Sequence, residues 1–176
     1  MILRPLEEKD TEALFELFKE EKGANWIDFP ITSLQRFKGH ISELLAGEFL
    51  GFAVPRVILD PVTQKIAGLI LLTNIDTENQ SAEMGTWLGF NYRGSGLNQQ
   101  AKAEMIQYAF TELNLAKILL VTAEQNIASI KAIAKLPYTC KTRGDEYGAL
   151  KKHYAFLYRK NILIYKITHE DFFAKK

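Results

Sequence analysis

The spacing of apolar residues predicts two amphipathic helices near the amino terminus. The first follows Asp10, which can act as its N-cap, and it ends before Gly23. The second starts at Thr32, because Thr32 and Gln35 have the spacing of a capping box, and Gly47 stops it. The aromatic loop between these helices is too apolar to be fully exposed to solvent.

Runs of apolar and β-branched residues, separated by turn residues, predict the strands of a sheet. These predicted strands cover residues 52–59, 65–74, 81–88, 118–123, 138–142, 154–158 and 162–167. Short turns join most of them, so antiparallel neighbours are expected.

One connection is different, because a glycine turn and a long amphipathic helix from about Leu97 join the strands at 81–88 and 118–123. Strand, turn, helix and strand of this length form a βαβ unit with two parallel strands. A short helix from Asn126 to Lys135 follows and stops at Pro137. The sequence therefore predicts a mixed α/β fold in one domain over residues 1–176. It has a mostly antiparallel central sheet, one parallel βαβ unit and helices on both faces.

The glycine turn, residues 93–96 with the sequence RGSG, is the segment that points most directly to a ligand. Glycines leave the main-chain N–H groups accessible, and the start of a helix directs unpaired N–H groups and a positive dipole end at an anion. Arg93 adds a fixed positive charge beside the turn. This combination predicts a phosphate-binding site.

The composition narrows the classes of protein. Hydrophobic residues make up 47% and the net charge is +1, so no overall field attracts nucleic acid or a membrane surface. The longest apolar run, residues 66–72, is too short for a membrane span, and the opening residues do not read as a secretory signal. The lone Cys140 fits a reducing compartment and is expected to be a small buried strand residue. We therefore expect a cytoplasmic protein.

Three blocks in the right order make the chain resemble a known family. Residues 93–98, RGSGLN, resemble the acetyl-coenzyme A signature R/Q-x-x-G-x-G/A of the GNAT superfamily. Residues 83–88, EMGTWL, resemble the strand before that signature in the ribosomal-protein N-acetyltransferase branch. Residues 126–129, NIAS, and 135–138, KLPY, are similar to that branch's N-x-x-S and K-L-G-F. Together they carry more weight than a single glycine motif.

Some positions depart from the family pattern. Asn98 stands where the signature usually has Gly or Ala, Gln100 replaces a usual glutamate, and Pro137 replaces a glycine. The tyrosine that many members use as general acid falls at Ile133, so that role is vacant. None of these changes removes the glycine turn.

The resemblance implies a site for acetyl-coenzyme A as co-substrate. The pyrophosphate is expected on the N–H groups of a run flanked by Arg93, namely Gly94, Ser95, Gly96, Leu97 and Asn98. The pantetheine arm is expected between the strands at 81–88 and 118–123, with a backbone N–H near Trp87 or Leu88 facing the thioester oxygen. Asn126 would contact the pantetheine amide, and Ser129 would stabilise the leaving thiolate.

Glu83 is the candidate general base, because its strand would face the amine. Each role has a plainer interpretation. Glu83 can be a solvated surface carboxylate, Asn126 a helix cap only, and Ser129 an exposed helix serine. An aromatic group, Trp26, Phe29 and Phe37, can wall the acceptor pocket or fill the core. The histidines lack metal-ligand spacing, so no metal is expected.

The predicted function is direct transfer of an acetyl group to a primary amine, either a protein amino terminus or a small amine. A non-catalytic acyl-coenzyme A sensor is the alternative. A nucleotide-binding Rossmann turn is disfavoured, because Gln99 stands where its third glycine is needed. Family members are often dimers, so a homodimer is expected, and neither nucleic acid nor a membrane is expected as a partner.

Overall fold

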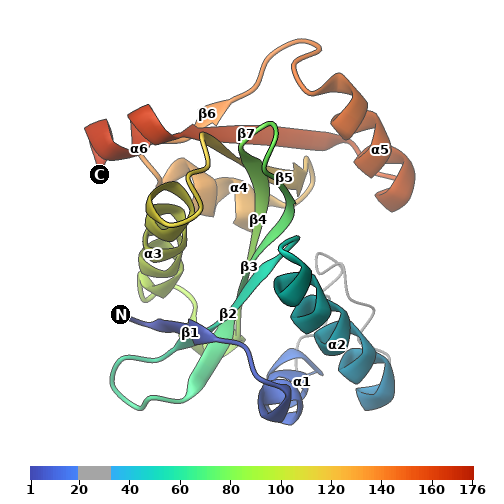
Figure 1. Cartoon of the computed structure of the whole chain (residues 1–176), viewed down its shortest axis with the longest axis vertical. Coiled ribbons are helices and arrows are strands. Elements are labelled where there is room, and N and C mark those ends of the chain that lie inside the picture. Colours follow the sequence, from blue (N-terminus) through green and yellow to red (C-terminus); the bar gives the residue numbers. More distant parts are fainter. Residues whose placement is uncertain (20–32) are drawn as a thin grey trace.

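The computed structural model describes residues 1–19 and 33–176. A single sheet of seven strands runs through it in the order β1-β2-β3-β4-β5-β7-β6 (Figure 1). The strands are β1 (Leu3–Pro5), β2 (Val54–Leu59), β3 (Ile66–Asp76), β4 (Ser81–Leu88), β5 (Lys117–Ala123), β6 (Cys140–Lys141) and β7 (Ile162–Thr168). The helices are α1 (Thr11–Lys19), α2 (Leu34–Leu50), α3 (Leu97–Thr111), α4 (Ile127–Ala134), α5 (Gly148–Tyr158) and α6 (His169–Lys175), with short 3-10 turns at Glu8–Asp10 and Phe90–Tyr92.

The predicted fold class is confirmed. All neighbouring strands pair antiparallel except β4 and β5, which are the two strands of the βαβ unit. The helices α3, α4 and α6 cover one face of the sheet, and α1, α2 and α5 lie on the other (Figure 1). Among residues 1–19 and 33–176, no helix has both the length and the apolar character that a bilayer crossing requires.

Each face of the sheet has its own apolar core. The larger cluster joins strand residues such as Ile70 and Ile118 to Met105 of α3, Ile133 of α4 and Phe172 of α6. The smaller cluster lies under α1 and α2, and it is made by Leu6, Leu14, Phe18, Phe37, Ile41, Leu44, Val57 and Leu69. Phe37 is fully buried there, so for this residue the interpretation as core packing is confirmed.

The start of the first helix differs in detail from the prediction. Asp10 is the third residue of a 3-10 turn, and its carboxylate accepts a hydrogen bond from the Glu7 N–H at 2.9 Å. The same carboxylate receives two hydrogen bonds of 2.8 Å from the Arg4 guanidinium. Burial alone would raise the pKa of Asp10, but these hydrogen bonds outweigh it, and the pKa lies below its usual value.

The second helix starts and ends later than predicted. Its N-cap is Ser33, whose hydroxyl accepts from the Arg36 N–H at 3.2 Å. It continues through Gly47 and ends at Gly51, which has φ +84. The glycine that ends a helix is the one that takes the left-handed conformation, and Gly47 has no such φ. The predicted residues Gly23, Thr32, Trp26 and Phe29 lie outside the described part of the chain.

The carboxy-terminal third contains the clearest error of the prediction. Residues 154–158 belong to α5, not to a strand, and α6 was not predicted. A short apolar run such as YAFLY suits a strand or a buried helix equally, and periodicity cannot separate the two. Cys140 does lie on a strand, but it is exposed rather than buried.

Candidate active site

The strands β4 and β5 pair over three positions and then part. Their parallel ladder joins Ser81, Ala82 and Glu83 to Lys117, Ile118 and Leu119. Beyond the pair of Glu83 and Leu119, β4 continues to Leu88 and β5 to Ala123, but in the described residues the two strands no longer pair with each other. The facing backbone groups of these two segments are therefore left for another partner.

The outer part of β4 is held firmly on its other side. The antiparallel ladder with β3 continues to the pair of Gly68 and Leu88. A β-carbon on Gly68 would lie only 2.1 Å from the Trp87 carbonyl oxygen, so this close approach requires glycine. The slot between β4 and β5 therefore has one rigid wall along its length.

The predicted phosphate-binding turn lies at the far end of β4. Gly94 and Gly96 have φ of +75 and +83, in the region that favours glycine. Gly96 is the N-cap of α3, and no side-chain oxygen of the described residues caps this helix. Its first N–H groups and positive dipole end are thus turned toward the space in front of the turn.

Two side chains brace that turn from within. The Arg93 Nε donates to the Leu88 carbonyl at 3.1 Å, and the Ser95 hydroxyl donates to the Tyr92 carbonyl at 2.8 Å. The side chain of Arg93 is therefore anchored to the end of β4. Asn98, in the first turn of α3, has a buried Oδ1 without a hydrogen-bond partner in the described residues.

Two other predicted residues, Asn126 and Ser129, lie on the β5 side of the slot. Asn126 is the N-cap of α4, and its Oδ1 accepts from the Ser129 N–H at 3.1 Å. The capping role is confirmed, and it places Asn126 and Ser129 in one turn directly after β5. Thr86 on β4 and Thr122 on β5 each bury a hydroxyl that lacks a partner in the described residues. Sequence alone does not identify these threonines, because nothing local marks a strand threonine as unpaired.

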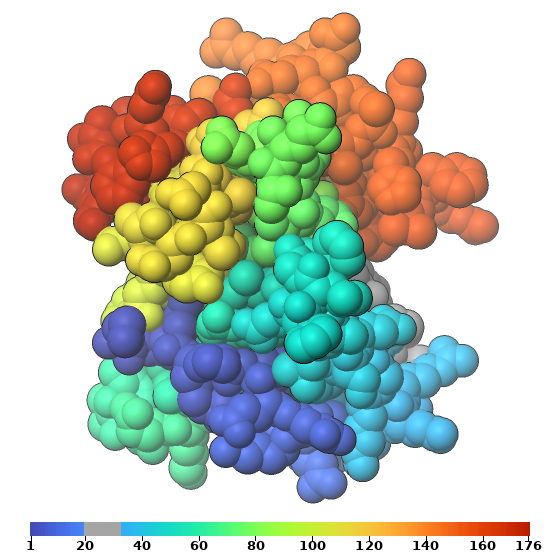
Figure 2. Space-filling view, in the orientation of Figure 1, coloured from blue at the N-terminus to red at the C-terminus, as the bar shows by residue number. Residues whose placement is uncertain are grey.

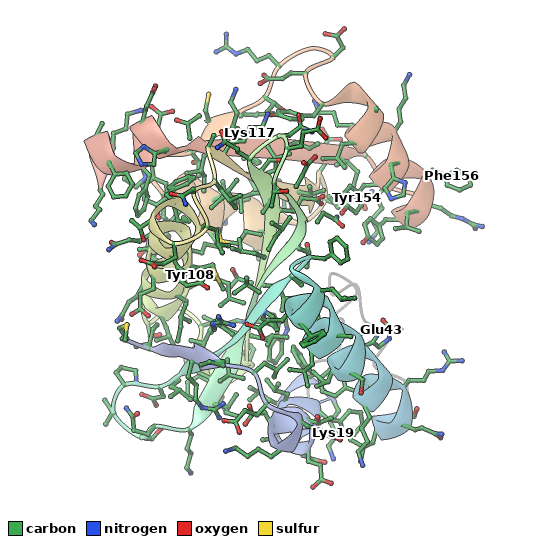
Figure 3. All side chains as sticks on the ribbon, viewed as in Figure 1. Lys19, Glu43, Tyr108, Lys117, Tyr154 and Phe156 are labelled. Carbon is green, nitrogen blue, oxygen red and sulfur yellow. The ribbon has the colours of Figure 1, made fainter. Side chains whose placement is uncertain are left out.

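Glu83 lies where the two strands begin to part. Its Oε2 accepts from the Asn74 side-chain amide at 2.8 Å, and its Oε1 accepts from the Tyr154 hydroxyl. It is half-buried and both of its carboxylate oxygens accept hydrogen bonds, so it is not fully exposed. Tyr154 comes from α5, and its ring stacks on Tyr158 with centroids 5.5 Å apart. Figure 3 shows Tyr154 directed toward the sheet.

The same face of β4 contains an open position between two larger side chains. Alternate residues of a strand face the same side of the sheet, so Glu83, Gly85 and Trp87 all lie on the side of α1, α2 and α5. A β-carbon on Gly85 would meet no described atom within 4 Å. Trp87 packs on Phe18, with ring centroids 3.7 Å apart. Within the described residues, no side chain therefore covers β4 at Gly85, between Glu83 and Trp87.

The chain thus combines two parallel strands that part after three pairs, a glycine turn before α3 and a carboxylate beside the parting point. The GNAT acetyltransferase domain model matches residues 1–139, and the chain belongs to this family. It is an N-acetyltransferase, as the sequence predicted.

Relatives and solved structures agree with this membership. The uncharacterised N-acetyltransferase p20 of Bacillus licheniformis is 26% identical over 164 residues, covering 93% of this chain and 92% of that protein. The RimL ribosomal L7/L12 α-N-protein acetyltransferase, in complex with coenzyme A, matches with a TM-score of 0.78 at 17% identity, covering 96% and 94% of the two chains.

A third neighbour is the spermidine N-acetyltransferase of Vibrio cholerae in complex with coenzyme A and spermine. It matches with a TM-score of 0.76 at 18% identity, covering 97% of this chain and 96% of that one. At these identities the two solved structures show the shared fold. Their acceptors are of two kinds, a protein amino terminus and a polyamine.

Proposed function

We propose that this chain transfers an acetyl group from acetyl-coenzyme A directly to a primary amine bound beside Glu83. The observation that carries this proposal is the parting of β4 and β5 immediately after Glu83, in line with the glycine turn at the other end of β4. A long phosphorylated thioester fits such a slot, and its reactive end then lies next to a carboxylate.

The binding residues of the proposal follow the slot from end to end. Backbone N–H groups of residues 94–98 take the pyrophosphate, and Arg93 lies beside it. The unpaired backbone of β4 binds the pantetheine amides, with Asn126 and the buried hydroxyls of Thr86 and Thr122 alongside. A backbone N–H on the unpaired edge of β4 close to Glu83 faces the thioester oxygen, as a donor worth about 3 kcal/mol in comparable acyl transfers. Trp87 and Leu88 lie four and five residues from Glu83, roughly 13–17 Å along the strand, so their N–H groups face the pantetheine arm rather than the thioester.

The chemistry needs one proton acceptor and one leaving group. The amine nitrogen attacks the thioester carbon while the Glu83 carboxylate accepts the amine proton. The carbon–sulfur bond then breaks, and the Ser129 hydroxyl stabilises the departing thiolate, which takes up a proton to give the free thiol. Ile133 is 2% exposed and has no hydroxyl, so it supplies no acid. Tyr154 instead lies within hydrogen-bond reach of the base.

A binding assay and a turnover assay together test the proposal. Excess acetyl-coenzyme A is expected to raise the melting temperature, because a ligand of the native state stabilises it by mass action. Free thiol is then expected to appear when a peptide with a free amino terminus or a small amine is added. Stabilisation without thiol release from any amine would identify a sensor module instead. Absence of stabilisation would reject the site itself.

We also propose that residues 1–176 form one domain, because one sheet connects β1 to β6 through all seven strands. The cytoplasmic location and the homodimer stay predictions. Size-exclusion chromatography with light scattering tests the dimer, and a mass equal to the 20.1 kDa monomer would reject it.

A further inference from the structure

The outward side of α5 carries exposed side chains that the proposed reaction does not use. Phe156 is 87% exposed and Leu157 is 56% exposed. Figure 3 shows Phe156 directed away from the body, whereas Tyr154 of the same helix points inward. In the space-filling view α5, in orange, forms a projecting ridge at the upper right (Figure 2). Neighbouring exposed apolar side chains on such a ridge indicate a contact surface.

The charge of this region has one sign. From Tyr147 to Thr168 the chain has no aspartate or glutamate, and it has five cations: Lys151, Lys152, Arg159, Lys160 and Lys166. Carboxylates of the described segments lie next to it in the sequence or by contact. Glu146 pairs with Lys166 at 2.7 Å, Glu124 accepts from the neutral Asn161 amide at 3.2 Å, and Asp145 is exposed just before α5. The cations therefore remain in excess. Glu83 is bonded to Tyr154. The surface of α5 is therefore basic as well as apolar.

A polar hollow lies on this basic surface, near the end of α5. It has a volume of about 380 Å³ and is lined by Gln125, Ala155, Arg159, Lys160 and Asn161. Arg159 lies five residues beyond Tyr154, which is roughly 7 Å along a helix. Gln125 immediately precedes the cap Asn126. An acceptor with its amine at Glu83 thus has cationic groups within reach of the residues that follow.

We propose that α5 is the docking surface for an acidic polypeptide whose free amino terminus is the acceptor. This inference rests on the proposed function and names its substrate class. Acidic side chains just after the amino terminus bind at Arg159 and Lys152, while Phe156 and Leu157 contact apolar groups of the same partner. The same cations repel a polyamine, because each of its other ammonium groups brings a like charge to the surface.

A binding experiment tests the surface without any turnover. A fluorescent peptide with a free amino terminus and acidic residues after it is titrated against the full chain with coenzyme A present. Its affinity should exceed that of a peptide with lysines in place of the acids by at least tenfold, and the difference should shrink at high salt. Equal affinity for the two peptides would overturn the proposal.

Charge reversal then locates the surface. The variant with Lys152→Glu and Arg159→Glu should lose the preference for the acidic peptide. The matched control, Lys38→Glu with Lys65→Glu, changes the same charge at exposed positions outside α5 and should keep the preference. Circular dichroism and melting of each variant verify folding. A charge-reversed α5 that still prefers the acidic peptide would overturn the assignment.

Turnover separates this inference from the proposed function. Thiol release with spermidine at a higher kcat/KM than with the acidic peptide would overturn the acidic acceptor and leave the acetyltransferase intact. Tight binding of the acidic peptide with no thiol release from any amine would reject the proposed reaction and leave the docking surface. Stronger displacement of the peptide by a short single-stranded RNA than by an unlabelled acidic peptide would assign the surface to nucleic acid instead.

Discussion

The hydroxyl of Tyr154 donates a hydrogen bond to Oε1 of Glu83, and so joins α5 to the point where β4 and β5 part. The two residues are 71 positions apart in the sequence. Asn74 donates to the other carboxylate oxygen at 2.8 Å, so both oxygens of Glu83 are held in place. A general base acts best when its position is fixed before the substrate arrives, because no binding energy is then used to orient it.

Replacement of Glu83 by glutamine is expected to lower kcat by roughly 100-fold or more, since general base catalysis contributes about 10²–10⁴-fold. The glutamine keeps the shape and can still accept from Asn74, but it cannot take the amine proton. Stabilisation by acetyl-coenzyme A should remain. Glu43→Gln, an exposed change on α2, is the control. Wild-type turnover in Glu83→Gln would remove Glu83 from the mechanism.

The Tyr154→Phe variant keeps the aromatic ring on Tyr158 and removes the hydroxyl. A hydrogen bond to a charged group is worth about 1.5–3 kcal/mol, so a loss of roughly 10-fold to 100-fold in kcat/KM is expected. Tyr158→Phe removes a hydroxyl from the neighbouring ring of the same helix and serves as the matched control. Wild-type kcat/KM in Tyr154→Phe would assign Tyr154 to packing alone.

Residues of this site that depend on local sequence were predictable, whereas residues that reach it from distant elements were not. The strand Ser81–Leu88, the cap Asn126 and the glycine turn each depend on residues close in sequence, and the structure has all three. The contacts of Tyr154 and Asn74 depend on how distant elements meet, which local pattern does not contain. The prediction of a strand at residues 154–158 also hid the contact with Glu83, because a strand there places Tyr154 in the sheet rather than above Glu83.

The Gly96→Ala variant tests the phosphate-binding turn. Alanine at φ +83 is strained by about 1–2 kcal/mol, and relief of that strain turns the N–H groups away. Binding of coenzyme A should weaken by about tenfold or more, at 1.4 kcal/mol per factor of ten. Gly39→Ala is the matched control: it lies inside α2 with no described atom within 4 Å of its β-position and should gain about 0.5–1 kcal/mol of stability. Equal coenzyme A affinity in both variants, measured by calorimetry, would reject the turn as the phosphate site.

Lys102 of α3 imposes a stability cost that depends on pH. The side chain is 7% exposed, and burial lowers the pKa of Lys102 to about 8 from 10.5. The unfolded chain therefore holds this proton over a range where the native chain has released it. The free energy of unfolding should rise as the pH increases from about 8 to about 10.5.

Below pH 8 the native state carries a buried charge at a cost of roughly 3 kcal/mol, the free energy that corresponds to this lowering of the pKa. Lys102→Met keeps the length of the side chain without the charge, so it should stabilise the protein at pH 7 and lose most of that advantage above pH 10. Urea unfolding of wild type, Lys102→Met and the exposed control Lys38→Met at both pH values measures the difference directly. Wild type and Lys102→Met share every titrating group except Lys102, so their comparison isolates this lysine, and Lys38→Met measures the effect of losing an exposed lysine. A Lys102→Met variant that is less stable at pH 7 would show that the ammonium is paired in the native protein rather than merely buried.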